Sequence, residues 1–280
     1  MPSKVEIIPI HCKARFEEFD LASVVASEIS RNRQRLKDRD VLVISSKFAA
    51  VAEGRFVELK GVKPGPGARR LSRSYGIDPQ ISELILEESD SILGGIRGFV
   101  LAFAKGVLAP NAGIDRSNAR PGYAILYPSN FDLTARNLRS RLLSSRSRSP
   151  STRNSGGRGT SKLRNLGVVL CDSRISPARL GTTGVAISVA GFEPVRDLRG
   201  TTDLFGNKLK VTMRALADQI ASAAEIVMGE STESVPVVIV RGADVSFLDR
   251  DDDRKMSIEP ENCLIIQGLK NHFTGRYSLV

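Results

Sequence analysis

The sequence predicts a mixed α+β fold in which helices pack on mixed sheets. Strand-like and helix-like segments follow one another without the steady strand–helix–strand alternation of a doubly wound protein. The chain of 280 residues is 41% hydrophobic and 26% charged, a composition that supports a substantial core. It contains no G-x-x-x-x-G-K-[ST] sequence, so a nucleotide would have to bind by a design other than the P-loop.

Strands in the first half are predicted where β-branched and apolar residues alternate or cluster. These segments cover residues 5–10, 40–47, 56–59, 98–104 and 123–127.

Helices between these strands are predicted from apolar residues that recur every three or four positions. They cover residues 21–36, 68–75, 79–93 and about 133–143. Asp20 is a suitable N-cap for the first of them. Asp78 and Pro79 are suitable as the N-cap and first-turn residue of the third.

The second half predicts strands over residues 166–171, 184–189, 235–240 and 263–267. A long helix is predicted over residues 211–228, and an acidic loop over 249–253. The buried face of that helix is predicted to include Met213, Leu216, Ile220, Ala224 and Val227.

A basic insert interrupts the chain at residues 141–165. It holds seven Lys and Arg residues and no acid, so +7 of the net charge of +10 lies there. The insert is too poor in apolar residues to fold by itself. We expect a flexible, solvated loop; the alternative is an electrostatic patch for nucleic acid or another polyanion.

Composition also bears on location. No apolar run approaches the ~18 residues that a membrane span needs, and the first residues lack a secretory leader. We therefore expect a cytoplasmic protein without membrane association. The three cysteines are far apart, so neither a disulfide framework nor a zinc site is expected. Cys171 and Cys263 are expected to be buried.

The polar run of residues 111–118 lies between two apolar strand-like segments. Asp115 stands near Gly113, with Asn111 and Asn118 at either end. A carboxylate with amide neighbours can hold a divalent cation and donate hydrogen bonds to phosphate, and glycine allows close backbone approach. The alternative is an Asx-rich turn formed for local reasons.

Three other segments suit the same chemistry. Asp172 and Ser173 follow the buried strand 166–171, and Glu230 lies in a polar loop after the long helix. Ser46 and Lys47 end the strand 40–47, where hydroxyl and amine groups suit phosphate, although two serines after a strand often mark only a turn. Together the acidic positions predict one assembled metal–nucleotide site.

Several separate motifs in order give the chain a resemblance to a known family, the coenzyme F(420)-0:L-glutamate ligases, also called γ-glutamyl ligases. The resemblance runs from about Val5 to Arg241 and is broken by the basic insert. The motifs lie at residues 41–45, 52–55, 111–118, 172, 184–187, 189–191, 203–206, 211–212, 217–218 and 227–230.

The resemblance implies an intertwined, two-lobed α+β homodimer. Residues 1–140 and 166–280 would then be the N-terminal and C-terminal parts of one ligase domain, on either side of the insert 141–165. It implies an enzyme that joins L-glutamate to the carboxylate of F(420)-0 through an acyl phosphate and then adds γ-linked glutamates. GTP would be a substrate, with two divalent cations, magnesium or manganese, and a monovalent cation, potassium.

The same resemblance implies roles for individual residues. Asp115, Asp172 and Glu230 would be catalytic metal ligands, and Ser173 stands where the family has a metal-binding threonine. The positions that match GTP contacts are Ser46, Lys47, Asn118, Met228, Gly229, Glu230, Ser231, Thr232, Glu233, Ser234 and Val235.

The sequence departs from the family pattern in places. Residues 11–16 replace a Gly-Leu-Pro nucleotide loop, and Val51 replaces a lysine. Residues 174–183 are altered around the acceptor, where Arg179 aligns with a family arginine and Arg174 does not. Both arginines are candidates for binding an acceptor anion. The alternatives are a related ligase acting on another carboxylate, or a non-catalytic binder of nucleotides or polyanions; nucleic acid is not expected as a partner.

Overall fold

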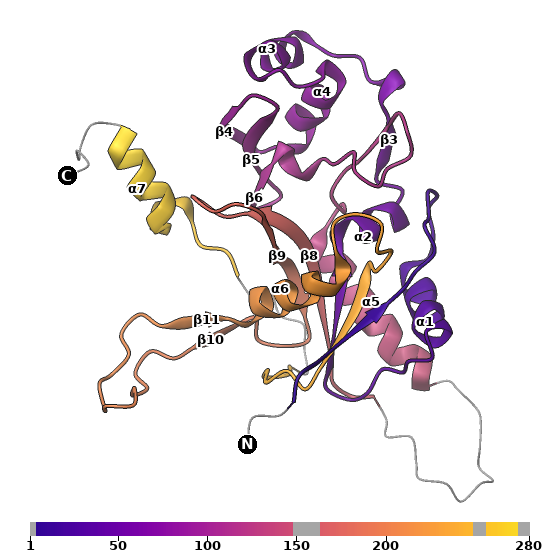
Figure 1. The fold of residues 1–280 in the computed structure, drawn as a ribbon, viewed down its shortest axis with the longest axis vertical. Helices are drawn as coiled ribbons and strands as arrows, with labels where there is room; N and C mark the ends of the chain where they lie inside the picture. Colours follow the sequence, from indigo (N-terminus) through magenta and orange to yellow (C-terminus); the bar gives the residue numbers. More distant parts are fainter. Residues whose placement is uncertain (1–3, 148–162, 249–255, 274–280) are drawn as a thin grey trace, which may run out of the picture.

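The computed structural model describes residues 4–147, 163–248 and 256–273 (Figure 1). At its centre is a five-stranded mixed sheet in the order β1-β12-β2-β8-β9. Its strands are β1 (Glu6–Ile10), β12 (Val237–Arg241), β2 (Asp40–Ser45), β8 (Leu166–Ile175) and β9 (Thr182–Ala190). Strands β2 and β8 are parallel, and the other neighbouring pairs are antiparallel.

Helices cover both faces of this sheet. One face packs against α1 (Leu21–Arg31) and α5 (Phe131–Ser147), and the other against α6 (Leu216–Met228). Because successive side chains of a strand point to opposite faces, Leu42 and Ile44 of β2 enter the first core while Val41 and Val43 enter the second. The central strands are therefore apolar on both faces, as their continuous hydrophobic runs require.

A second lobe lies beyond one edge of the central sheet, at the top of Figure 1. It contains the three-stranded sheet β4 (Ser91–Ile96), β5 (Phe99–Ala104) and β6 (Val107–Pro110), together with helices α3 (Pro66–Tyr75) and α4 (Pro79–Glu88). The short pair β3 (Phe56–Glu58) and β7 (Tyr123–Ile125) joins this lobe to the rest. Helix α2 (Ser46–Ala52) follows β2 at the junction.

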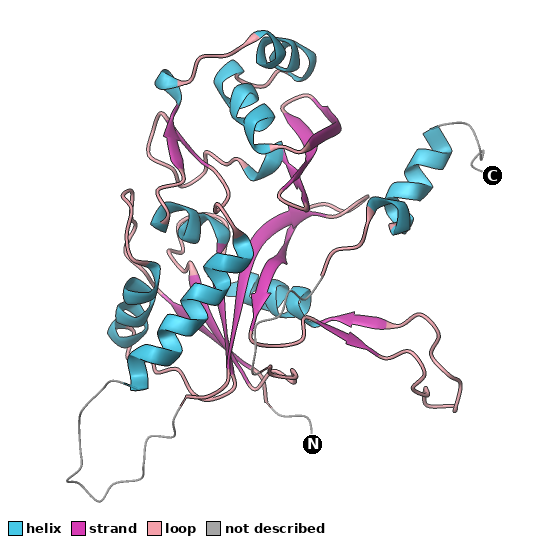
Figure 2. Cartoon of the chain, turned by 180° about the vertical axis from the view of Figure 1, so that it is seen from behind, coloured by secondary structure: helices cyan, strands magenta, loops and turns pink. Residues whose placement is uncertain are grey.

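Two segments project from the body, as Figures 1 and 2 show. One is the arm formed by β10 (Val195–Asp197), β11 (Met213–Ala215) and the loop between them. The other is helix α7 (Leu264–Phe273). Leu204 and Phe205 of the arm are 99% and 90% exposed, and Leu264 of α7 is 86% exposed.

The predicted fold class, mixed sheets with packed helices, is confirmed. Asp20 also caps α1 as predicted, because its Oδ1 accepts from Ser23 N at 2.8 Å. The helix is shorter than residues 21–36, since it ends at Arg31 and Arg33 has a positive φ of 56°.

Two predicted strand ends are wrong. The strand of residues 40–47 ends at Ser45, and Ser46 begins α2, because the alanine-rich run that follows favours a helix. The strand of residues 166–171 instead continues to Ile175, because β9 pairs with it from Val168 to Ile175. Asp172 and Ser173 are therefore strand residues.

Two predicted helix ends are also wrong. The helix of residues 211–228 begins only at Leu216, and Met213 lies in β11 with 52% of its surface exposed. The helix of residues 79–93 ends at Glu88, and its last predicted residues belong to β4. In the first place a strand directly adjoins the helix, and in the second only two residues separate them, so the apolar pattern continues across the boundary.

The predicted strand of residues 263–267 is wrong, because most of it lies in helix α7. A short apolar run cannot be assigned to a strand or a helix by periodicity alone. Cys263 is partly exposed, contrary to the prediction, whereas Cys171 is buried as predicted.

Most of the basic insert and the acidic loop of residues 249–253 lie outside the described residues. The first residues of the insert, up to Ser147, belong to α5. None of the helices in the described part of the chain is long and apolar enough to span a membrane.

Candidate functional site

The topology of the central sheet gathers three distant segments at one edge. Strand β2 ends there, with Ser45 opposite Cys171, while its parallel neighbour β8 continues to Ile175. The antiparallel strand β12 begins at the same edge, with Val237 opposite Ile44. Ser46, Asp172 and the loop before β12 therefore meet, although they are far apart in the sequence.

A cavity of about 500 Å³ lies at this edge. It brings together most residues predicted for the site. The predicted residues that line it are Lys47, Asp115, Asn118, Asp172, Ser173, Met228, Gly229, Glu230, Ser231, Thr232, Glu233, Ser234 and Val235. Ser46 does not line the cavity but donates a hydrogen bond to Asp172, which does. Arg174 and Arg179 do not line the cavity.

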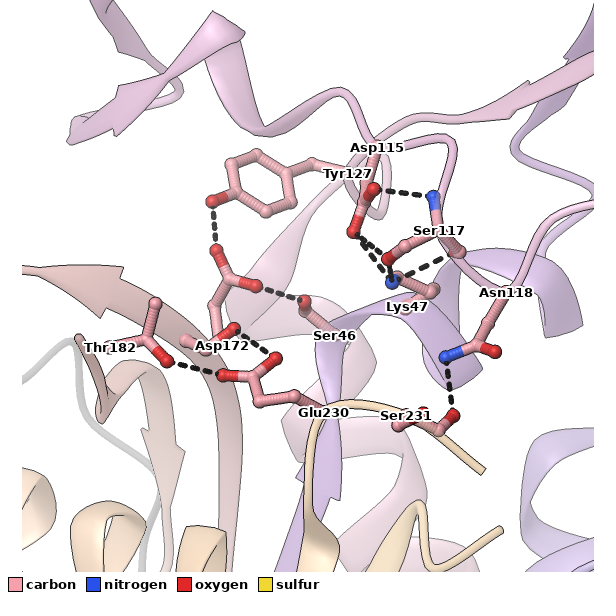
Figure 3. Close-up of polar contacts among 11 residues, drawn as sticks. Ser46, Lys47, Asp115, Ser117, Asn118, Tyr127, Asp172, Thr182, Glu230 and Ser231 are labelled. Atoms are coloured by element: carbon pink, nitrogen blue, oxygen red, sulfur yellow. Dashed lines mark hydrogen bonds and ion pairs between the residues drawn. The ribbon is translucent and has the colours of Figure 1, made fainter. Parts of the chain in front are cut away.

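Asp172 is held through both carboxylate oxygens (Figure 3). Its Oδ1 accepts from Ser46 Oγ at 3.2 Å, and its Oδ2 accepts from the hydroxyl of Tyr127. Burial raises the pKa of Asp172 above its usual value, against the lowering effect of Tyr127 and Arg174. Burial and the adjacent Asp172 carboxylate also raise the pKa of Tyr127, so its hydroxyl stays protonated and donates.

Asp115 lies on the opposite wall and is anchored by its backbone to β7. Its N donates to Ile125 O at 3.0 Å, and Ile125 N donates to Asp115 O at 2.8 Å. The side chain accepts from Ser117 N at 2.6 Å and forms an ion pair with Lys47 Nζ at 2.6 Å (Figure 3). Partial burial opposes ionisation, but Lys47 and Ser117 together hold the pKa of Asp115 below its usual value.

Glu230 is held by two hydroxyls from the central sheet. Its Oε1 accepts from Thr182 Oγ1 at 2.6 Å, and its Oε2 accepts from Ser173 Oγ at 3.2 Å (Figure 3). Glu225 of α6 lies beside it, where burial and the charges of Glu230 and Asp172 raise the pKa of Glu225 to about 7. Negative charge therefore accumulates on this wall.

The oxygen donors on this wall suit magnesium or manganese, which prefer carboxylate and other oxygen ligands. Glu225 and Glu230 form no ion pair with Lys or Arg within the part of the chain that the structure describes, so a bound cation would balance their charge. Among the described residues no three His, Cys, Asp or Glu side chains converge on one point.

The loop before β12 is hydrogen-bonded to the loop after Asp115. Asn118 Nδ2 donates to Ser231 O at 3.0 Å, and Glu233 accepts from Ser231 N at 2.8 Å. Gly229 has a φ of 67°, and a Cβ at that position would lie 2.2 Å from Glu233 Cδ. A glycine is therefore required where this loop leaves α6.

The cavity lining also includes basic and apolar residues. Lys13, Arg15 and Phe16 come from the segment that replaces the family's nucleotide loop, and Phe48 and Val51 come from α2. The lining thus combines carboxylates suited to cations with basic and apolar residues suited to an anionic, planar ligand.

The structure places the two candidate acceptor arginines differently. Arg174 is largely buried and donates from Nη1 to Leu108 O at 2.6 Å and from Nη2 to Tyr127 Oη at 3.3 Å. Arg179 is exposed in the turn before β9, where its backbone N donates to Ser176 O at 3.2 Å. Arg174 is therefore engaged by the protein, while the Arg179 side chain faces solvent.

Four residues that contact the carboxylates of the site could not be recognised from the sequence. They are Ser117, Tyr127, Thr182 and Glu225. Ser117 lies within the polar run of residues 111–118, so proximity to Asp115 was its only signal. Tyr127, Thr182 and Glu225 lie in a strand end, a strand and a helix, and they reach the site only through tertiary packing.

Comparison with known proteins agrees with the motifs. The sequence profile of the F(420)-0:gamma-glutamyl ligase family matches residues 10–151 and 160–242. The chain belongs to this family of ligases, which confirms the predicted resemblance. The unmatched residues 152–159 fall inside the basic insert.

The curated relatives cover most of the chain. A coenzyme F(420):L-glutamate ligase of Methanopyrus kandleri is 38% identical over 240 residues, covering 85% of this chain and 86% of the relative. The ligase of the same name from Methanothermobacter thermautotrophicus is 33% identical, covering 89% and 93%. That of Methanosarcina mazei is 33% identical, covering 95% of both chains.

Proposed function

We propose that this protein is a GTP-dependent ligase of coenzyme F(420) biosynthesis. It joins L-glutamate to the carboxylate of F(420)-0 through an acyl phosphate and then extends the product with γ-linked glutamate. Family membership supports the reaction class. The observation that carries the proposal is the convergence of Asp115, Asp172 and Glu230 on one cavity, from three distant parts of the chain.

The acidic residues would hold two divalent cations. Asp172, Ser173 and Glu230 suit one, and Asp115 suits the other, because such cations take one or two carboxylates and complete their shell with phosphate oxygens. Bound cations would neutralise the charge of the nucleotide phosphates, so that the terminal phosphoryl group can pass to a carboxylate. Potassium as an additional monovalent cation follows from the family resemblance alone.

The protein's own groups would position the reactants. Lys47 and the backbone of residues 228–235 suit the phosphate groups of the nucleotide, and the amide of Asn118 fixes that loop through Ser231. The phosphorylated acceptor is then attacked by the amine of L-glutamate, which displaces phosphate. Positioning and charge stabilisation supply most of the rate enhancement in such transfers.

The direct test is a ligation assay on the purified protein with F(420)-0, L-glutamate, GTP and Mn²⁺. Mass spectrometry should detect a product with one added glutamate, and later products with more. Replacing GTP with ATP measures the nucleotide preference. Absence of any product under all these conditions would reject the proposed function.

One observation favours a second candidate, a related ligase acting on a different carboxylate. Residues 174–183 depart from the family pattern, and Arg174 is engaged by Leu108 and Tyr127. Under this alternative, GTP hydrolysis stimulated by Mn²⁺ would be measurable without F(420)-0, and F(420)-0 would not be consumed.

Arg179 is proposed to bind the acceptor, because it is exposed in the turn that leads to Thr182, a partner of Glu230, and aligns with a family arginine. Replacing Arg179 with Ala should raise KM for F(420)-0 about tenfold, as expected when a charge-assisted bond worth roughly 1.5–3 kcal/mol is lost. KM for GTP should change little. Steady-state kinetics with each substrate varied in turn provide the measurement, and an effect confined to GTP would contradict the assignment.

We also propose that two chains form the intertwined homodimer of the family. The exposed apolar residues Leu204 and Phe205 on the arm would be covered by the second copy. Residues 1–140 and 166–280 would act as one ligase domain. A monomeric mass in light scattering at assay concentrations would contradict the dimer.

A further inference from the structure

Tyr127 is the buried residue that joins the polar site to the core. It follows β7, is 3% exposed, and packs its ring edge-on against Phe131 with the centroids 5.3 Å apart. Its hydroxyl reaches across to Asp172 Oδ2 (Figure 3). Because the ring is fixed by packing, the hydroxyl has a fixed position from which to donate.

Arg174 supports this hydroxyl from the other side. It lies two residues after Asp172 on β8, so both side chains point to the same face of the strand. Its Nη2 donates to Tyr127 Oη at 3.3 Å, and its Nη1 donates to Leu108 O of β6 at 2.6 Å. Its Nε lies 3.8 Å from Asp172 Oδ2. Arg174 therefore ties the site strand to the second lobe.

The hydrogen bonds run in one direction. An arginine can only donate and an ionised carboxylate can only accept, whereas a phenol does both. Tyr127 thus accepts from Arg174 and donates to Asp172. With Ser46 on the other oxygen, contacts on both sides fix the plane of the Asp172 carboxylate. Its remaining lone pairs are left for a ligand in the cavity.

We propose that Tyr127, held by Arg174, is a positioning residue that orients the Asp172 carboxylate toward a divalent cation. The inference rests on the proposed function for the identity of the cation. Arg174 then supports a metal ligand and does not bind the acceptor. Groups that support metal ligands from behind change metal affinity by about 10–100-fold when they are removed.

The test is Tyr127→Phe, which keeps the ring and removes only the hydroxyl. Calorimetric titration of the protein with Mn²⁺ should show an affinity about tenfold lower than that of the wild type. Thermal unfolding should change little, because the packing is kept. Tyr123→Phe is the matched control, since Tyr123 begins β7, the strand that Tyr127 follows, and lies outside the cavity lining. This variant should bind Mn²⁺ as the wild type does.

A second variant, Arg174→Lys, keeps a positive charge but cannot hold Leu108 and Tyr127 together. It should also lower Mn²⁺ affinity, by less than Tyr127→Phe does. Unchanged Mn²⁺ affinity in both variants overturns the inference, as does a loss of stability with affinity retained. If wild-type protein ligates while the variants bind Mn²⁺ normally, only the inference fails. If the variants lose affinity but wild-type protein never ligates, only the proposed function fails.

Discussion

Replacing Asp172 with Asn is expected to lower the ligation rate by roughly three orders of magnitude or more, because the substitution removes a charge where, in the proposed reaction, cations and phosphates would meet. The shape of the side chain is kept. Asn can still accept from Tyr127, so the hydrogen bond that holds the residue need not be lost. Folding should therefore remain intact.

Turnover with F(420)-0, GTP and Mn²⁺ measures the effect, and circular dichroism checks the fold. Asp244→Asn is a suitable control, since Asp244 is an exposed partner of Arg196 that does not line the cavity. It should retain wild-type turnover. Near-normal turnover of Asp172→Asn would remove this residue from the catalytic machinery.

Replacing Gly113 with Ala is expected to destabilise the protein by about 3 kcal/mol or more. Its φ is 75°, a conformation that costs roughly 1–2 kcal/mol for a residue with a Cβ. The added Cβ would lie 1.9 Å from Cε2 of the buried Tyr127 ring. Overpacking of this kind adds roughly 1–3 kcal/mol.

Gly106→Ala separates the two causes. Gly106 has a φ of 78°, but a Cβ there would meet no atom within 4 Å. Its substitution should cost about 1–2 kcal/mol, from the backbone alone. Denaturant unfolding of both variants gives the difference, and equal losses of stability would show that the Tyr127 ring moves aside without cost.

The sequence was most informative where polar residues interrupt apolar runs. Asp115 and Glu230 stand out because nothing in core packing explains a carboxylate in those turns, and the cavity includes both. The α+β class followed from the order of apolar segments. The family followed from several motifs in the right order, which local propensity alone could not have indicated.

The remaining features depend on tertiary structure. Asp172 was expected after a strand, but pairing with β9 extends β8 to Ile175, and pairing partners cannot be read from a single segment. Lys47 lies in the first turn of helix α2, and not at a strand end, because the alanine-rich run that follows it is buried as a helix. Tyr127 is an ordinary strand-end aromatic in the sequence, and its hydroxyl gains a role only when β8 lies opposite it.

The sheet edge that gathers the site also determines when the site can exist. Ser46 and Asp172 are 126 residues apart, and Asn118 and Ser231 are 113 apart. Contacts this distant in the chain are expected to form slowly, because loop-closure entropy must be lost before they can stabilise the fold. No fragment that lacks β2, β8 or β12 can assemble the cavity. A chain synthesised only as far as β8 therefore lacks the cavity, which can form only when the central sheet is complete.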